Sequence, residues 1–327
     1  MNIEDIPPKY YVLDEFKFEN GEVLENQKVE YITLGTPQYD DEGFITNAVI
    51  YFHGTSGNYG SIRRISEELG ENRAFDTDKL FFISLSTLGT PGSCSPSTSN
   101  MGRNFPEYTI ADMVNFNKQF IMECLNVKHL RGVIGNSMGG FEAVMWACMY
   151  PDDMDFLISL VSSYKVGGQN YVLSKLMYDV IVSDPNFECD ENIDELKRSL
   201  IISSKAMYSF GLSRQFYMDQ PVEDIAKYMD EFAYEDAQED VFDAFYRCVA
   251  SMNYDLTDCV ENIKVKTLII GIYEDQYFPP ELDAIPMHAK IKDSRLICYN
   301  SYLGHVGSSE LSKIHNELED FMSEFKY

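Results

Sequence analysis

The stretch GVIGNSMGGFEAVMWA, residues 132–147, contains a serine whose surroundings could make it a nucleophile. Ser137 lies in the pattern G-x-S-x-G, after an apolar β-type run and before a helix-type run. This context predicts a sharp strand-to-helix turn that exposes the hydroxyl, with the first N–H groups of the new helix facing any oxyanion that forms. We therefore interpret Ser137 as a catalytic nucleophile rather than as part of a structural glycine turn.

A serine hydroxyl needs a general base, and the base needs a carboxylate to orient it. Of the five histidines, His305 lies in SYLGHVGSS, directly after the last predicted strand. In a strand-turn-helix architecture of this kind the chain order is serine, acid, histidine. The stretch GIYEDQYFPPE includes the end of a predicted strand between the two, and Glu274 and Asp275 come soon after this strand. We choose Asp275 as the orienting acid and keep Glu274 as the alternative.

The oxyanion of the reaction needs two backbone donors. The first is expected to be the N–H of Met138, the residue after the nucleophile. The second should come from the loop that follows an early strand, and NAVIYFHGTSG supplies such a loop. We choose the N–H of Thr55 and expect His53, at the end of the same strand, to shape the loop rather than act as the base.

Short β-type runs alternate with helical patterns, which predicts an α/β fold with a mostly parallel sheet and helices on both faces. The runs cover residues 29–35, 47–54, 79–86, 131–137, 155–163, 266–272 and 295–300. Several are almost continuously apolar, as expected for strands that are covered on both sides. A helix is expected over residues 109–125, with Thr109 as its N-cap.

Residues from about 165 to 260 interrupt this alternation with amphipathic, acidic helical patterns and no convincing strand. This length is far greater than one crossover connection between parallel strands needs. The sequence therefore predicts a core formed by residues 1–164 and 261–327, with a helical lid inserted over residues 165–260.

Composition limits the compartment and the partners. The formal net charge of −27 would repel nucleic acid and anionic lipid, so neither is an expected partner. The chain has no run of about 18 apolar residues, and its acidic start lacks a secretory pattern, which favours a cytoplasmic protein. Seven cysteines without a CxxC pair argue against a disulfide framework or a thiolate zinc site. No motif for a metal or another cofactor is present, so none is expected.

Several stretches resemble the homoserine O-acetyltransferases and their relatives of the α/β-hydrolase fold. They are HGTSG, AFDTDKLFFISLSTLGTPGSCSPST, NFPEYTIADMV, GNSMGG, DQYFPPE and the GH of the histidine loop. The resemblance extends over about residues 30–310. It implies an α/β-hydrolase fold with a helical lid and a triad of Ser137, Asp275 and His305. It also implies an oxyanion hole formed by Thr55 and Met138, and a homodimer that pairs through lid helices.

The lid stretch FGLSRQFYMDQPVE differs from that of true homoserine acetyltransferases, which place an F-G-R arginine there to meet the amino acid carboxylate. Arg214 lies outside this pattern, and Asp219 stands near the position where an arginine is expected. An aspartate would repel the carboxylate that an arginine fork binds. GLSRQFY and DQYFPPE look more like the hydrolase-labelled branch of the family.

Three functions are therefore considered. The first is hydrolysis of a small acyl ester through an acyl-serine intermediate. The alternative is transfer of an acyl group from acyl-CoA to homoserine or a similar small alcohol, with Arg63 and Arg64 as candidates for binding the CoA phosphates. The third is a non-catalytic relative that binds a ligand under the lid. Hydrolysis and transfer use the same triad, so the residues leave the choice between them open.

Overall fold

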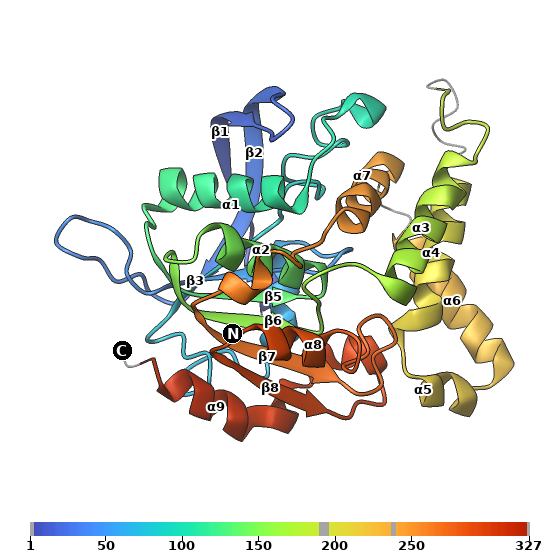
Figure 1. Ribbon diagram of the computed structural model, residues 1–327. Helices are drawn as coiled ribbons and strands as arrows, with labels where there is room; N and C mark the ends of the chain where they lie inside the picture. The colour runs from blue at the N-terminus through green and yellow to red at the C-terminus, as the bar shows by residue number, and fades with distance from the viewer. Residues whose placement is uncertain (1–2, 190–195, 237–239, 326–327) are drawn as a thin grey trace.

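The computed structural model describes residues 3–189, 196–236 and 240–325, and its centre is a single sheet (Figure 1). The eight strands follow the order β1-β2-β4-β3-β5-β6-β7-β8. They are β1 (Lys9–Lys17), β2 (Val23–Leu34), β3 (Ala48–Phe52), β4 (Phe81–Leu85), β5 (Leu130–Asn136), β6 (Met154–Leu160), β7 (Lys266–Ile272) and β8 (Ser294–Tyr299). In this order, neighbouring strands from β4 to β8 pair in parallel. The pairs β1–β2 and β2–β4 are antiparallel.

One of the two edge strands of the sheet, β1, was not predicted. Only Leu13 and Phe16 are buried along its length, so it lacks the apolar run that indicates an internal strand. The internal strands β3 and β4 are instead buried at every position, as parallel strands with two covered faces must be.

Helices cover both faces of the sheet (Figure 1). The helices α1 (Ile110–Leu125), α2 (Met138–Met149) and α8 (Ala284–Lys290) contribute to the core on one face. The helix α9 (His315–Ser323) and the 3-10 helix Tyr59–Ile65 contribute to the core on the other face. The predicted α/β fold, with a mostly parallel sheet between two helical layers, is confirmed.

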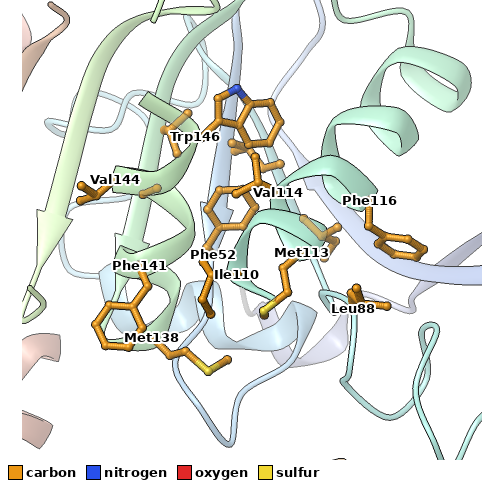
Figure 2. Close-up of a cluster of buried hydrophobic side chains, with 14 of the residues drawn as sticks. Phe52, Leu88, Ile110, Met113, Val114, Phe116, Met138, Phe141, Val144 and Trp146 are labelled. Atoms are coloured by element: carbon orange, nitrogen blue, oxygen red, sulfur yellow. The ribbon is translucent and has the colours of Figure 1, made fainter. Parts of the chain in front are cut away.

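The core beneath α2 is densely packed (Figure 2). Phe52 at the end of β3, Val114 of α1, and Val144 and Trp146 of α2 are completely buried. The rings of Phe52 and Trp146 stack with their centroids 5.9 Å apart. Because interiors of this density resist displacement, the packing fixes the start of α2 relative to the end of β3.

Between β6 and β7 the described residues form helices instead of strands. They are α3 (Gly168–Val182), α4 (Lys197–Gly211), α5 (Arg214–Asp219), α6 (Val222–Asp236) and α7 (Val241–Met252). The helix α3 packs against α4 and α7, and α4 packs against α6, in a group that stands beside the sheet in Figure 1. These helices fall within residues 165–260, the segment predicted as a lid.

Candidate active site

Ser137 lies at the junction of β5 and α2, in a backbone conformation that residues other than glycine rarely adopt. Its φ is 57° and its ψ is −120°, a strained combination that costs on the order of 1–3 kcal/mol. The surroundings impose this conformation, because the Ser137 N–H donates to the carbonyl of Leu160 in β6 at 2.9 Å. A Cβ at Gly135 would come within 2.1 Å of the carbonyl oxygen of Gly139, so the close turn requires glycine there.

Three side chains from distant parts of the chain meet at this turn. Ser137 Oγ lies 3.0 Å from His305 Nε2, and His305 Nδ1 lies 2.7 Å from Asp275 Oδ2. They follow β5, β7 and β8, and the carboxyl ends of parallel strands share one edge of a sheet. With Nδ1–H donated to Asp275, Nε2 can accept the proton of the serine hydroxyl.

The loop after β7 holds the carboxylate of Asp275 in a fixed orientation. Its second oxygen, Oδ1, accepts the backbone N–H groups of Tyr277 at 2.8 Å and of Phe278 at 3.1 Å. The side chain of Asp275 is completely buried, whereas that of His305 keeps 13% of its surface exposed. Asp275 is thus enclosed by protein, whereas His305 lines the cavity.

The alternative acid, Glu274, faces a different part of the loop. Its carboxylate accepts the backbone N–H of Ser301 at 2.7 Å and the Nδ2–H of Asn300 at 2.6 Å. It therefore ties the end of β7 to the loop that carries His305. The structure brings Asp275, and not Glu274, to the imidazole.

The two expected oxyanion donors lie on the wall of the cavity that contains Ser137. Met138 is the first residue of α2, and the first N–H groups of a helix have no partner within the helix. The loop that contains Thr55 passes next to Ser137, since a Cβ added to Gly54 would lie 3.3 Å from the Cβ of Ser137.

His53 supports this loop from inside the protein. Its ring is completely buried, with Nδ1 2.8 Å from the carbonyl oxygen of Gly54 and Nε2 accepting the N–H of Thr87 at 3.3 Å. Burial lowers the pKa of His53 to about 4, so the ring stays neutral. These contacts agree with a role in shaping the loop.

A cavity of about 330 Å³ lies between Ser137 and the helices of residues 165–260, a volume suited to a small ligand. Its apolar wall includes Phe141 of α2, Met177 of α3, Met207 and Tyr208 of α4, and Phe232 of α6. The side chains from α3, α4 and α6 were not predicted to face a cavity, because a helical aromatic residue or methionine carries no local sign that it does.

Three arginines also line the cavity. Arg63 and Arg64 come from the 3-10 helix Tyr59–Ile65 and were among the predicted candidates. Arg247 of α7 was not predicted. Arg214 is absent from the described lining of the cavity, and its Nε–H donates to Gln276 at 3.3 Å instead.

Two observations concern metals and membranes. Within the described ranges, no group of three or more His, Cys, Asp or Glu side chains is arranged to hold a metal ion. In the same part of the chain, no helix combines the length and the apolar character that crossing a bilayer requires.

Comparisons of sequence agree with this fold. A family model described as alpha/beta hydrolase fold matches residues 47–301. A probable acyltransferase of Methanothermobacter thermautotrophicus is 44% identical over 320 residues, which are 98% of this chain and 99% of that protein. A homoserine O-acetyltransferase of Haemophilus influenzae is 33% identical over 180 residues, which are 51% of this chain and 49% of that protein.

Solved structures with a similar fold include proteins named as ester hydrolases and proteins named as acetyltransferases. An acetylester hydrolase from Corynebacterium glutamicum has a TM-score of 0.84 at 21% identity, covering 97% of this chain and 96% of its own. A homoserine O-acetyltransferase from Bacillus anthracis also has a TM-score of 0.84, at 18% identity, covering 97% of both chains. Because the sequence identities are this low, the structural similarity shows a shared fold and nothing more. The chain therefore belongs to the α/β-hydrolase-fold family, as an enzyme of its homoserine O-acetyltransferase-like group.

Proposed function

We propose that this enzyme moves a short acyl group from an ester or thioester to the hydroxyl group of a small alcohol, through an acyl-Ser137 intermediate. The observation that carries the proposal is the pair of contacts of 3.0 Å and 2.7 Å that link Ser137, His305 and Asp275. The sequence alone favoured hydrolysis of a small acyl ester. The similarity to a probable acyltransferase along nearly the whole chain now favours transfer.

In the proposed acylation step, His305 Nε2 takes the proton of Ser137 Oγ as this oxygen attacks the carbonyl carbon of the donor. The backbone N–H groups of Met138 and Thr55 stabilise the oxyanion, and Asp275 stabilises the imidazolium. When the tetrahedral intermediate collapses, the bond to the leaving oxygen or sulfur breaks. His305 gives its proton to that group, and the acyl group remains on Ser137.

Deacylation repeats these steps with the acceptor. The acceptor hydroxyl loses its proton to His305 and attacks the acyl carbon, and the same donors hold the second oxyanion. Collapse releases the new ester and returns the proton to Ser137. Transfer requires that the acceptor reach the acyl group before water does, so the apolar lid side chains over the cavity support it.

Two arginines at the cavity support the proposal that the acyl donor carries phosphate groups, as acyl-CoA does. Arg63 and Arg64 line the cavity, and no carboxylate in the described part of the chain forms an ion pair with either. In a protein with 53 Asp and Glu residues, such arginines are suited to bind an incoming anion.

Hydrolysis of a small ester is the second candidate. The 13% exposure of the His305 side chain favours it, because water that reaches the base can deacylate the enzyme. The position of Arg214 outside the described cavity lining also gives homoserine no F-G-R arginine to bind.

The deciding experiment supplies purified protein with acetyl-CoA or with p-nitrophenyl acetate, each with and without L-homoserine. Thiol release from acetyl-CoA that requires the alcohol would establish transfer. Ester cleavage that is indifferent to the alcohol, with acetyl-CoA left intact, would establish hydrolysis. A rate equal to that of Ser137→Ala with every substrate would contradict the acyl-enzyme.

We also propose that the helices of residues 165–260 form a lid through which two copies pair. Apolar side chains on these helices are exposed to solvent, by 65% at Val172, 48% at Leu176, 80% at Met218 and 77% at Val222. Light scattering should give the mass of a dimer for the wild type and of a monomer for Val172→Glu with Leu176→Glu. The control is Val12→Glu, at an exposed position of β1, which should stay dimeric. A monomeric wild type would contradict this pairing.

A further inference from the structure

Tyr277 contacts both of the side chains proposed to act with Ser137. Its backbone N–H donates to Asp275 Oδ1 at 2.8 Å. Its ring lies at 88° to the imidazole of His305, with the two ring centroids 4.8 Å apart, and the ring centroid of Phe278 lies 5.8 Å from that of the same imidazole. Because closely packed rings resist displacement, the imidazole can turn away from Ser137 only if these rings move as well.

Two of the helices in residues 165–260 hold Tyr277 in turn. Its hydroxyl donates to the carbonyl of Met207 in α4, and its own carbonyl accepts the Nδ2–H of Asn170 in α3 at 3.3 Å. The two helices pack against each other. A tyrosine suits this place, because its flat apolar ring ends in a polar group that a carbonyl can fix. The helices therefore help to set where the ring stands beside the imidazole.

Further contacts join the loops of the proposed acid and base to the same group of helices. The turn between α4 and α5 contains Leu212 and Ser213. The carbonyl of Leu212 accepts the Nε2–H of Gln276, the residue after the proposed acid, at 2.7 Å. The hydroxyl of Ser213 donates to the carbonyl of Tyr302, in the loop that carries the proposed base, at 2.6 Å. One short turn thus contacts both loops.

Small displacements of the imidazole matter for the proposed reaction. His305 Nε2 must stay within hydrogen-bond distance of Ser137 Oγ, where it lies at 3.0 Å. At the same time, Nδ1 must stay with Asp275 Oδ2, at 2.7 Å. A shift of about 1 Å in such a group can cost about 100-fold in rate. A residue that prevents these shifts contributes to the rate without giving or taking a proton.

We propose that Tyr277 is a positioning residue, whose ring, anchored through its hydroxyl on α4, keeps the imidazole of His305 directed at Ser137. The helices α3 and α4 then take part in aligning the reacting groups, besides lining the cavity. This inference rests on the proposed acyl-Ser137 reaction and adds to it a residue that acts through His305. Its consequence is that the loss of one hydroxyl outside the proposed triad slows the chemical steps.

The test removes the anchor and the ring separately. Tyr277→Phe removes only the hydroxyl and keeps the ring, whereas Tyr277→Leu removes the ring as well. The N–H donated to Asp275 belongs to the backbone and remains in both variants. The matched controls are Tyr273→Phe and Tyr273→Leu, because Tyr273 lies earlier in the same loop, directly after β7, with 58% of its surface exposed.

The first readout is the steady-state cleavage of p-nitrophenyl acetate. Tyr277→Phe should lower kcat by about 3- to 10-fold, because the ring loses one hydrogen bond. Tyr277→Leu should lower kcat by about 10- to 100-fold, because the imidazole loses the ring. Acylation and deacylation both use His305, so Tyr277→Phe should slow them alike and leave KM unchanged. The Tyr273 variants should keep both constants.

The second readout follows the imidazole directly. The proton on His305 Nδ1, held by Asp275, should give a nuclear magnetic resonance signal downfield of the backbone amides, and His305→Ala should lack this signal. In Tyr277→Phe this proton should exchange with water faster than in the wild type, and in Tyr277→Leu faster still. In the Tyr273 variants its exchange should equal that of the wild type.

The inference requires both changes in Tyr277→Phe. A lower melting temperature with wild-type kcat would assign Tyr277 a purely structural role and overturn it. So would a loss of kcat without faster exchange of the Nδ1 proton, or a wild type that lacks the downfield signal. If Tyr277→Leu does not fold by circular dichroism, Tyr277→Phe decides, since it differs from the wild type by one oxygen atom.

Failure of the two proposals can be told apart. A wild type that cleaves p-nitrophenyl acetate no faster than Ser137→Ala contradicts the acyl-enzyme and removes the basis of this inference as well. A wild type that cleaves the ester, together with a Tyr277→Phe variant that matches it in kcat and in proton exchange, contradicts only the role of Tyr277.

Discussion

At the scale of single residues, the proposed reaction depends on one proton, which the two contacts of His305 would direct from Ser137 Oγ to Nε2. The contact from His305 Nδ1 to Asp275 Oδ2 leaves Nε2 facing Ser137 Oγ. The hydroxyl is presented by a backbone conformation that the turn imposes on Ser137, with φ at 57°. Removing the hydroxyl should therefore affect the reaction without disturbing the fold.

Replacing Ser137 by alanine should lower kcat for p-nitrophenyl acetate by at least about 10³-fold, because no nucleophile remains. A fluorophosphonate probe that labels the wild type should not label this variant. Ser209→Ala, at an exposed position of α4, serves as the control and should react normally. Activity of Ser137→Ala within a few-fold of the wild type would exclude Ser137 as the nucleophile.

The neighbouring acids should differ strongly in their effects. Asp275→Asn should lower kcat by on the order of 10³- to 10⁴-fold, since an amide cannot hold the imidazole in the same tautomer or stabilise its charged form. Glu274→Gln should have a much smaller effect, because the new side-chain oxygen can still accept the N–H of Ser301. Steady-state kinetics of both variants decides, and a larger loss in Glu274→Gln would reverse the choice of acid.

At the scale of elements, α1 and α2 both begin at a residue with a hydroxyl group, but only one of these hydroxyls caps its helix. In α1, the Thr109 hydroxyl accepts the N–H of Asp112 at 3.1 Å, and the Asp112 carboxylate accepts the N–H of Thr109 at 3.0 Å. In α2, Ser137 makes no side-chain capping bond, because its hydroxyl faces His305. The hydroxyl of Thr109 thus stabilises the start of α1, whereas the hydroxyl of Ser137 remains available for the proposed reaction.

Loss of the hydroxyl should therefore destabilise the fold only at α1. Thr109→Ala should lower the free energy of unfolding by about 1 kcal/mol, and Thr109→Ser should keep most of it. Ser137→Ala should leave the free energy of unfolding close to that of the wild type. Urea denaturation monitored by circular dichroism measures all three variants, and an equal loss at both positions would contradict this division of roles.

At the scale of the whole molecule, an acidic protein buries several carboxyl groups away from its charged surface. Burial raises the pKa of Glu142 to about 8, of Asp283 to about 7 and of Asp243 to about 6. Glu142 is completely buried in α2, where Thr87 Oγ1–H and Asn117 Nδ2–H donate to Oε2 at 2.8 Å and 2.7 Å. The folded state thus holds protons that the unfolded chain releases.

Glu142 should make stability fall as pH rises. Because its folded pKa of about 8 exceeds the ordinary value of 4.5, its contribution is complete below pH 4.5 and is lost progressively up to about pH 8. Glu142→Gln should remove this loss, which is on the order of a few kcal/mol, so the gap between the urea midpoints at pH 5 and pH 8 should narrow. Glu25→Gln, at an exposed position of β2, should leave the gap unchanged. A gap that is the same in Glu142→Gln and the wild type would contradict the raised pKa.

Some features of this protein follow from the sequence because they are local. The turn around Ser137 needs small residues between a strand and a helix, and the apolar runs of β3 to β8 mark strands covered on two faces. The position of His305 after the last strand follows from chain order. These patterns predicted the α/β fold and the residues that the structure brings to the serine.

Other features depend on which way a side chain faces in the folded protein, and no local sequence pattern encodes this. The edge strand β1 has too few buried side chains to be recognised, and Glu274 and Asp275 are adjacent in the chain although only Asp275 faces the imidazole. Arg247 looks like any cation of an amphipathic helix until α7 is docked through Asp243 on Ser97. Tertiary packing decides which side chains meet, because it fixes how elements far apart in the chain are rotated toward one another.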